Sequence, residues 1–439
     1  MTKQVLCMNP GPIEFEPRVL KQFAHEGISH VDKAVIEIFG QCLEKMRKVF
    51  LAPDGQPLVV TGSGTLGWDM VGANLVNRGD HVLVINTGYF GNHFGECLEH
   101  YGANISHLRA EIGSQPTLLE VETELKSGTN FKIVTITHVD TSTGVLADVK
   151  AIAATIRKHQ PNALIVVDGV CALGGEECRM KEWDLDVVLT GSQKCVGVPA
   201  GLSLMVVRPR ALQAFEKSTS TVKYYVNWKH WLPVMKAYEA RQPSYFATPA
   251  VNHLFALNEG LTILLENGGI EQRFREHKLV ANGIKDAIKA LGLSFVTDAT
   301  SGAHTLTCVR YPAGVGAADF LPKVYKRGVS LAGGLHKKIK TEYFRIGHMG
   351  PSTRRLDHAL KTIEAIEEAL IECGYAVPAK GKAVQVLKAL KKDIPLKPTC
   401  KYSTVVYHGC PVPARCQVYT IASLAAAVAA GFLLASLKK

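Results

Sequence analysis

Short apolar runs alternate with amphipathic stretches along the first 255 residues. The apolar runs are rich in valine, isoleucine and leucine and cover residues 57–60, 81–86, 132–137, 163–167, 186–190 and 203–207. Between them, helical periodicity occurs near residues 65–78, 90–102, 116–127 and 148–159. Because such runs are typical of buried strands, the alternation predicts an α/β domain with a mostly parallel sheet, which we place at residues 20–255.

The pattern changes beyond the predicted sheet. Residues 250–291 have helical periodicity, and residues 292–375 combine a strand-like run at 306–310 with a helix at 356–373. A chain of 439 residues is also too long for one ordinary hydrophobic core. We therefore expect a second, smaller α+β domain at residues 256–375.

The chain beyond residue 375 differs in charge and composition. The formal net charge is +11, but residues 376–439 hold ten basic residues and one acid, so they carry +9 of it. The rest of the chain is nearly neutral, which argues against a nucleic-acid-binding protein. We expect a basic linker at residues 376–416, with one short helix near 383–392.

An uncharged segment ends the chain. Residues 416–437 contain no charged side chain and reach the roughly 20 residues that a membrane helix needs. We expect a membrane-anchor helix at residues 417–439, and a helix packed within a dimer is the alternative.

Cysteine usage and the N-terminus indicate the compartment. Eleven cysteines occur without a C-x-x-C pair, which favours a reducing compartment and predicts neither a disulfide framework nor a metal site. The first twelve residues show no signal-peptide core. We expect an intracellular protein anchored to a mitochondrial or peroxisomal membrane, or else a cytoplasmic one.

Two residues at predicted strand ends carry the strongest chemical signal. Lys194 follows the strand at 186–190 through a turn of small residues. A lysine at this edge of an α/β sheet can form a Schiff base, or it can be an exposed turn residue. Asp168 ends the strand at 163–167, where it can keep a pyridinium nitrogen protonated or can cap the next turn. One strand–helix–strand unit separates the two residues, so both could face one planar ring.

Three further segments suit the same chemistry. Residues 61–68 (TGSGTLGW) join a strand to a helix, where backbone N–H groups can bind an anion or form a plain helix cap. Phe90 can stack on a planar cofactor or fill the core. Arg345 lies in an apolar run and can bind a carboxylate or form an internal salt bridge. We interpret His348 as structural.

In this order, the segments resemble the class V, fold-type I aminotransferases, and among these the fungal-like alanine–glyoxylate branch. The resemblance covers roughly residues 5–375. It rests on TGSGTLGW at 61–68, HVDTSTGVL at 138–146, VD at 167–168, GSQK at 191–194, YFATP at 245–249, GGLH at 333–336 and RIG at 345–347. It implies a mostly parallel seven-stranded sheet with helices on both faces, a smaller α+β domain, and pyridoxal 5'-phosphate as cofactor.

The resemblance also implies roles around the cofactor ring. Lys194 would hold the cofactor covalently and act as the base, and Asp168 would bind the pyridine nitrogen. Phe90 would stack on the ring. Ser142 would lie near the ring hydroxyl and the substrate.

Further residues would bind the phosphate and the substrate. The implied phosphate ligands are Ser63, Gly64, Thr65 and Gln193, joined by Tyr245 and Thr248 from the second subunit of a homodimer. Thr65 stands where animal relatives carry histidine, which puts that contact in doubt. Arg345 would bind the substrate carboxylate, and Gly11 belongs to an N-terminal segment, residues 1–19, that would line the pocket.

These implications predict transfer of an amino group from L-alanine or L-serine to glyoxylate, giving glycine and a 2-oxo acid. A cysteine desulfurase is one alternative, but it needs a reactive cysteine on a loop, and Cys308 lies in a strand-like run. A non-catalytic, membrane-tethered scaffold is the other. The joint presence of Lys194, Asp168 and Arg345 argues against the scaffold.

Overall fold

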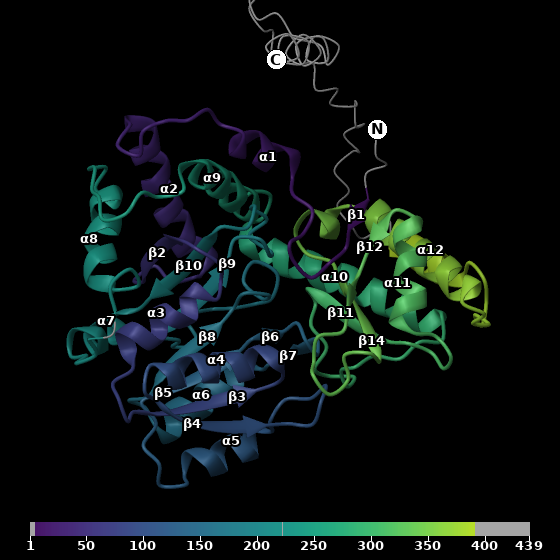
Figure 1. The fold of residues 1–439 in the computed structure, drawn as a ribbon, viewed down its shortest axis with the longest axis horizontal. Coiled ribbons are helices and arrows are strands. Elements are labelled where there is room, and N and C mark those ends of the chain that lie inside the picture. The colour runs from purple at the N-terminus through teal and green to yellow at the C-terminus, as the bar shows by residue number, and fades with distance from the viewer. Residues whose placement is uncertain (1–4, 222, 391–439) are drawn as a thin grey trace, which may run out of the picture. The chain divides into compact units, whose positions relative to one another are not determined.

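A seven-stranded mixed sheet forms the centre of the structure, a computed structural model that describes residues 5–221 and 223–390 (Figure 1). Its strands are β2 (Gln56–Thr61), β3 (His81–Asn86), β4 (Asn104–Arg109), β5 (Ile133–Thr137), β8 (Leu164–Asp168), β9 (Val187–Gly191) and β10 (Leu202–Val207). They are ordered β2-β10-β9-β8-β5-β3-β4. β10 alone runs opposite to the other six strands of this sheet. The predicted mostly parallel sheet is therefore confirmed.

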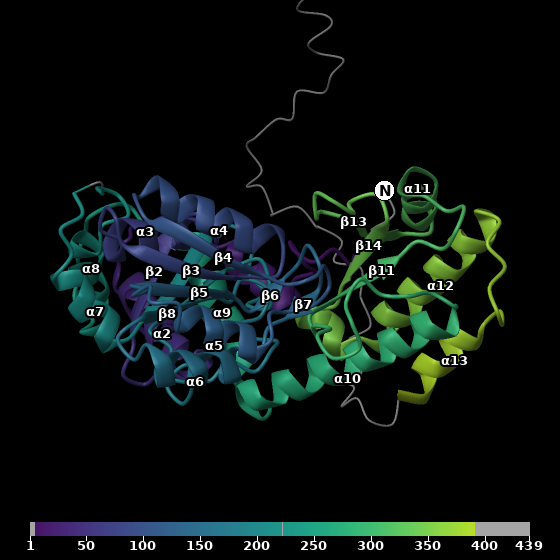
Figure 2. The same ribbon diagram turned by 90° about the horizontal axis from the view of Figure 1, so that it is seen from below.

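Helices cover both faces of this sheet, as predicted. α3 (Leu66–Leu75) and α4 (Tyr89–His100) lie on one face, and α5 (Leu118–Leu125) and α6 (Val149–His159) on the other (Figure 2). Around the end of the sheet at β2 the chain adds α1 (Pro17–Phe23), α2 (Lys33–Val49), α7 (Pro209–Glu216), α8 (Trp228–Glu239) and α9 (Val251–Leu265). We call the sheet with these helices the large lobe.

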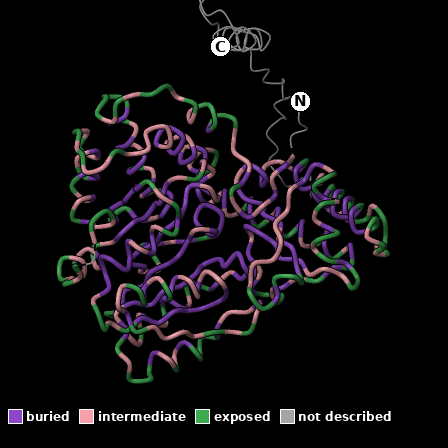
Figure 3. Tube along the Cα trace, viewed as in Figure 1, coloured by how far each residue is buried: buried purple, intermediate pink, exposed green. Residues whose placement is uncertain are grey.

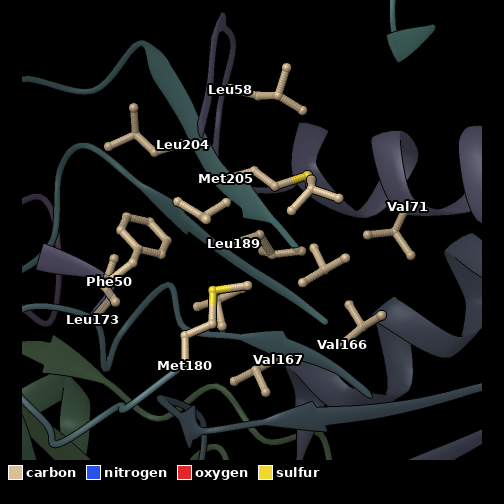
Figure 4. Close-up of a cluster of buried hydrophobic side chains, with 14 of the residues drawn as sticks. Phe50, Leu58, Val71, Val166, Val167, Leu173, Met180, Leu189, Leu204 and Met205 are labelled. Carbon is tan, nitrogen blue, oxygen red and sulfur yellow. The ribbon is translucent and has the colours of Figure 1, made fainter. Parts of the chain in front are cut away.

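The core of the large lobe explains the apolar runs in the sequence. Every residue of β5, β8, β9 and β10 is buried, because helices cover both faces of these strands (Figure 3). Phe50, Met180, Leu189 and Leu204 pack together between the layers and are each at most 1% exposed (Figure 4). Burial of each such side chain contributes about 1.5–3 kcal/mol.

A smaller lobe follows. Its three-stranded antiparallel sheet has the order β11-β14-β13. The elements are α10 (Gly269–Ala290), β11 (Leu306–Arg310), α11 (Ala317–Lys326), β12 (Val329–Ser330), β13 (Ala332–Gly333), β14 (Tyr343–Gly347), a 3-10 helix (Gly350–Arg354), α12 (Leu356–Glu372) and α13 (Lys382–Ala389). α10 joins the lobes, since Ile270 belongs to the core of the large lobe and Val280 and Ile284 to that of the small lobe.

The small lobe extends further than its composition suggested. Ala383, Val384 and Leu387 of α13 are buried in the small-lobe core, against α10 and α12. Residues 382–389 therefore pack on this lobe, although the sequence pattern predicted a linker from residue 376. Residues of the predicted linker beyond 390 lie outside the described residues.

The N-terminal segment connects the lobes. β1 (Leu6–Cys7) pairs in parallel with β12, and the Gly347 N–H donates to the Met8 carbonyl at 2.7 Å. The segment then continues to Pro10 and Gly11 at the edge of the central sheet, where Lys194 Nζ donates to the Pro10 carbonyl. Residues 6–11 thus contact both lobes.

Among residues 5–221 and 223–390, no helix is both long and apolar enough to cross a membrane. The anchor helix predicted at residues 417–439 lies outside the described residues.

Candidate active site

Lys194 and Asp168 lie at the same edge of the central sheet. Asp168 is the last residue of β8, and Lys194 follows the end of the neighbouring strand β9 through the turn after Gly191. In the register of these strands, Asp168 lies opposite Leu189. The positive charge of Lys194 is close enough to lower the pKa of Asp168. The two side chains therefore share one site.

The Asp168 carboxylate is buried and fixed by two hydrogen bonds. Its oxygens accept from the Trp68 indole N–H and from the Val170 N–H, both at 2.9 Å. The Trp68 ring stacks on Phe94, with centroids 5.3 Å apart. Burial raises the pKa of Asp168 to about 6, although these hydrogen bonds and Lys194 oppose the rise. Trp68 ends the TGSGTLGW motif, but no local pattern in the sequence signals its bond to Asp168.

This pKa predicts a pH effect on the protein without cofactor. In the unfolded chain Asp168 titrates near its ordinary value of 3.8, and in the folded protein near 6. The folded state therefore holds the proton more tightly, and that stabilisation is lost as the pH rises from about 4 through 6. The free energy of unfolding should therefore fall by an amount that approaches about 3 kcal/mol, because each pKa unit corresponds to about 1.4 kcal/mol.

Urea unfolding of the cofactor-free protein and of Asp168→Asn, near pH 4 and near pH 7, measures this effect. The stability of the wild type relative to the variant should fall towards the higher pH. The same difference at both pH values would contradict the prediction.

A second buried carboxylate, Asp140, holds the start of α4. One of its oxygens accepts from the backbone N–H groups of Phe90 (3.1 Å) and Gly91 (3.4 Å). The other accepts from the N–H (2.9 Å) and the hydroxyl (2.6 Å) of Ser142. Negative charge stabilises a helix N-terminus, so Asp140 fixes the backbone that carries the half-buried Phe90 ring. Asp140 was not among the residues predicted for the site.

Ser142 forms part of the same network. It is fully buried, its hydroxyl proton is donated to Asp140, and its oxygen accepts from the Tyr89 N–H at 2.9 Å. Its side chain therefore supports the start of α4. Its expected contacts with the cofactor hydroxyl and the substrate stay predictions.

The loop between β2 and α3 leaves backbone donors free. The N–H groups of Leu66, Gly67 and Trp68 donate back to the three preceding carbonyls at 2.9–3.0 Å, which forms a tight first turn. Within the described residues, no acceptor contacts the N–H groups of the loop residues Ser63, Gly64 and Thr65. Three free N–H groups at the start of a helix suit an anion.

Gln193 lies against this loop. A Cβ atom added to Gly191 would lie 2.9 Å from Gln193 Oε1 and 3.3 Å from the Gly64 Cα. Gln193 Oε1 is buried and has no partner among the described residues. A polar side chain left unpaired beside free backbone donors indicates a polar ligand at this corner.

An open cavity of about 690 Å³ adjoins the loop and the aromatic side chains. Thr65, Trp68 and Phe90 line it, together with α4 residues that include His93 and Cys97. The ring of Phe90 is thus reachable from solvent.

Gly11 covers the Lys194 side chain from the N-terminal segment. Its φ of +105° lies in the region that favours glycine. A Cβ atom at this position would collide with Cδ, Cε and Nζ of Lys194. The positive φ favours glycine here, and the absence of a side chain lets the lysine lie directly against the backbone.

Arg345 enters the site from β14 in the small lobe. Its Nε donates to the Gly333 carbonyl at 2.7 Å and its Nη1 to the Thr141 carbonyl at 3.3 Å. No carboxylate pairs with this half-buried guanidinium anywhere in residues 5–221 or 223–390. Among the described residues, Arg345 therefore forms no internal salt bridge, which was the alternative interpretation.

Tyr245 and Thr248 lie apart from this cluster. They occupy the exposed loop between α8 and α9, and their hydroxyls lie 3.3 Å apart. Tyr245 is 60% exposed. In the described part of the chain, neither residue forms a hydrogen bond with the cluster around Lys194. This chain alone does not bring them to the site.

Known proteins resemble this chain along most of its length. The profile of the family described as Aminotransferase class-V matches residues 18–350. Alanine–glyoxylate aminotransferase 1 of Saccharomyces cerevisiae is 38% identical over 363 residues, which cover 80% of this chain and 93% of the yeast protein. Serine–glyoxylate aminotransferase of Arabidopsis thaliana is 27% identical and covers 89% of this chain and 96% of its own.

A solved structure shares the fold. The ureidoglycine–glyoxylate aminotransferase of Bacillus subtilis superimposes with a TM-score of 0.82 at 28% identity. The match covers 89% of this chain and 99% of the bacterial one.

Proposed function

Since the chain belongs to the class V aminotransferases, we propose that it transfers the amino group of a small amino acid, L-alanine or L-serine, to glyoxylate, giving glycine and a 2-oxo acid. Relatives named for alanine and serine as donors, each with glyoxylate, support these substrates. The observation that carries the proposal is Arg345: a guanidinium with no acidic partner among the described residues faces the loop that carries Ser142. Such a group suits the carboxylate of an amino acid.

Pyridoxal phosphate is the cofactor of this family, and the residues present fit it. The free N–H groups of Ser63, Gly64 and Thr65 suit its phosphate, and the Gln193 amide can join them once it is turned so that its N–H donors replace the unpaired Oε1. The buried Asp168 carboxylate suits its pyridine nitrogen, and Phe90 suits its ring. When bound, pyridoxal phosphate supplies a ring that withdraws the electron pair left on the substrate after loss of the α-proton.

Lys194 performs the proton transfers in this proposal. With the cofactor bound, Lys194 Nζ would accept the α-proton of the amino acid and would later give a proton back. The lysine alone can do both, so no separate catalytic histidine is needed. Pro10 accepts from Nζ, which holds the amine at the sheet edge.

Arg345 orients both substrates. The amino donor and glyoxylate each have a carboxylate, so one guanidinium serves both half-reactions. The sequence offers no second arginine dedicated to a side-chain carboxylate, which favours monocarboxylic donors. Gly334 follows the Gly333 carbonyl that Arg345 contacts, and a Cβ atom there would collide with the Lys340 carbonyl, so no side chain fits at this position.

Spectroscopy of the purified protein with its cofactor tests the proposal. Addition of alanine should remove the absorption of the lysine-bound cofactor and release pyruvate, and glyoxylate should then restore it and release glycine. Serine in place of alanine ranks the donors. No spectral change with either donor would contradict the proposal.

The desulfurase alternative needs a reactive cysteine, and Cys308 is a poor one. Cys308 lies opposite Arg345 in the β11–β14 pair and is 2% exposed. Burial raises the pKa of its thiol to about 12, so the reactive thiolate is scarce at neutral pH. The same protein given cysteine should release no sulfide.

A homodimer with shared sites is part of the proposal. Tyr245 and Thr248 are exposed and paired with each other, which suits phosphate ligands offered to a second subunit. Mixed dimers of Lys194→Ala and Tyr245→Phe subunits test this, because one of their two sites would have both residues intact. Refolded mixtures should therefore regain activity that neither variant has alone, and no regain would exclude shared sites.

We also propose that the segment at residues 417–439, which is uncharged up to Leu437, anchors the enzyme to an intracellular membrane, mitochondrial or peroxisomal. Its lack of charge and the basic residues before it support this. Cell fractionation of the full chain and of a chain ending at residue 416 decides the matter. Equal recovery of both chains in the soluble fraction would exclude the anchor.

A further inference from the structure

One buried hydroxyl joins the two lobes beside the site. Tyr343 lies on β14 and has no exposed surface. Its hydroxyl accepts from the backbone N–H groups of Leu335 (2.8 Å) and His336 (3.0 Å) and donates to the Ser142 carbonyl. These three bonds use its one proton and both of its lone pairs.

Arg345 bridges the same two segments. It follows Tyr343 by two positions, so the two side chains leave β14 on the same side. Its Nε contacts the Gly333 carbonyl and its Nη1 the Thr141 carbonyl. Residues 333–336 form a turn of the small lobe, and residues 141–142 lie in a loop of the large lobe. The side chains of Tyr343 and Arg345 each form hydrogen bonds with both segments.

The loop at residues 141–142 is also hydrogen-bonded to the part of the site that carries Phe90. Ser142, whose carbonyl Tyr343 contacts, is bonded through its side chain to Asp140 and to the start of α4. Asp140 fixes the backbone of Phe90. A continuous set of hydrogen bonds therefore runs from the turn at residues 333–336 through Tyr343 and Ser142 to Phe90. Burial raises the pKa of the Tyr343 phenol, so its donor proton is retained.

We propose that the Tyr343 hydroxyl is a positioning group for substrate recognition. It sets where Arg345 stands relative to the residues around Lys194, so that the guanidinium meets the carboxylate of a small 2-amino or 2-oxo acid. The inference rests on the proposed function and adds a residue that acts through Arg345. Tyr343 differs in this from an ordinary core tyrosine, whose hydroxyl would matter only for stability.

Tyr343→Phe tests the proposal, with Tyr311→Phe as the matched control. The Tyr311 hydroxyl, in the same lobe, is buried without a partner among the described residues, and its ring packs on Phe344 at 5.4 Å. Calorimetric titration of the cofactor-loaded protein with propionate, which has the carboxylate of alanine but no amine, measures carboxylate binding without turnover. Tyr343→Phe should weaken propionate binding about tenfold, and Tyr311→Phe by less than about twofold.

Kinetics and a double variant complete the test. In Tyr343→Phe, KM for alanine and for glyoxylate should rise by the same factor, while kcat and the spectrum of the bound cofactor stay near those of the wild type. In an Arg345→Gln background, Tyr343→Phe should add little, because the two act together. Unchanged propionate affinity in Tyr343→Phe, or a full further loss in the double variant, would overturn the proposal.

Two further measurements test the role of Tyr343 even if the variant does not fold or the proposed function is wrong. If Tyr343→Phe does not fold, hydrogen exchange of the wild type decides: the Leu335 and His336 amides should exchange slowly, and more slowly still with propionate. Fast exchange at both would overturn the proposal. Absence of transamination in the wild type would refute the proposed function, while propionate binding would still decide the role of Tyr343.

Discussion

Replacement of Lys194 by alanine is expected to lower turnover by about 10⁴-fold or more and to remove the absorption of the lysine-bound cofactor. Lys194 provides the amine beside the buried Asp168 carboxylate, and the N-terminal segment at Pro10 and Gly11 packs directly on it. Under the proposed function, the variant would lose both the covalent attachment of the cofactor and the group that carries the proton. Glycine formed from alanine and glyoxylate measures the loss.

A matched lysine separates this effect from a general loss of charge. Lys181 is exposed in the turn before β9, and Lys181→Ala should keep wild-type activity. A small primary amine added to Lys194→Ala should restore part of the turnover, since it can carry the same proton. Normal activity in Lys194→Ala without such an amine would reject the assignment of the base.

Replacement of Arg345 by glutamine is expected to lower kcat/KM by about 10²–10³ for alanine and for glyoxylate alike. Glutamine keeps a donor but removes the charge and the two-armed geometry that suit a carboxylate. Alanine and glyoxylate both have a carboxylate, so kcat/KM should fall for both. Steady-state kinetics with each substrate varied in turn measures the two values.

The neighbouring strand offers the control. Arg310 ends β11 and pairs with Glu342 at 2.9 Å near the surface, so Arg310→Gln should change kcat/KM by less than about twofold. Cofactor binding should be similar in both variants. A loss confined to glyoxylate would mean that Arg345 does not hold the amino donor.

Most of the large lobe could be predicted because its strands are buried on both faces. Six apolar runs correspond to six observed strands, among them β8 and β9, which carry Asp168 and lead to Lys194. The edge strand β4 (Asn104–Arg109) was missed. Its sequence, NISHLR, is half exposed and mixes polar with apolar residues, so it lacks the continuous run that marks a covered strand.

The site was predictable where chemistry lies at strand ends and unpredictable where it depends on distant partners. Lys194, Asp168 and the loop at Ser63 could be placed from the strand pattern alone. Asp140 reads in sequence as an ordinary turn residue, and its importance comes from Phe90, 50 positions away. Tyr343 bonds to Ser142 across 201 positions. No local pattern encodes contacts of that separation.

The N-terminal segment sets an order for assembly during synthesis. Asn9 bonds to Ser330 at 3.1 Å, 321 positions further along, and β1 has no partner strand until β12 exists. A growing chain can complete the central sheet long before that point, because domains fold from the N-terminus as they emerge. The lysine then stays uncovered until the last quarter of the chain leaves the ribosome. A nascent chain stalled before residue 329 would leave β1 unpaired and this side of the pocket unfinished.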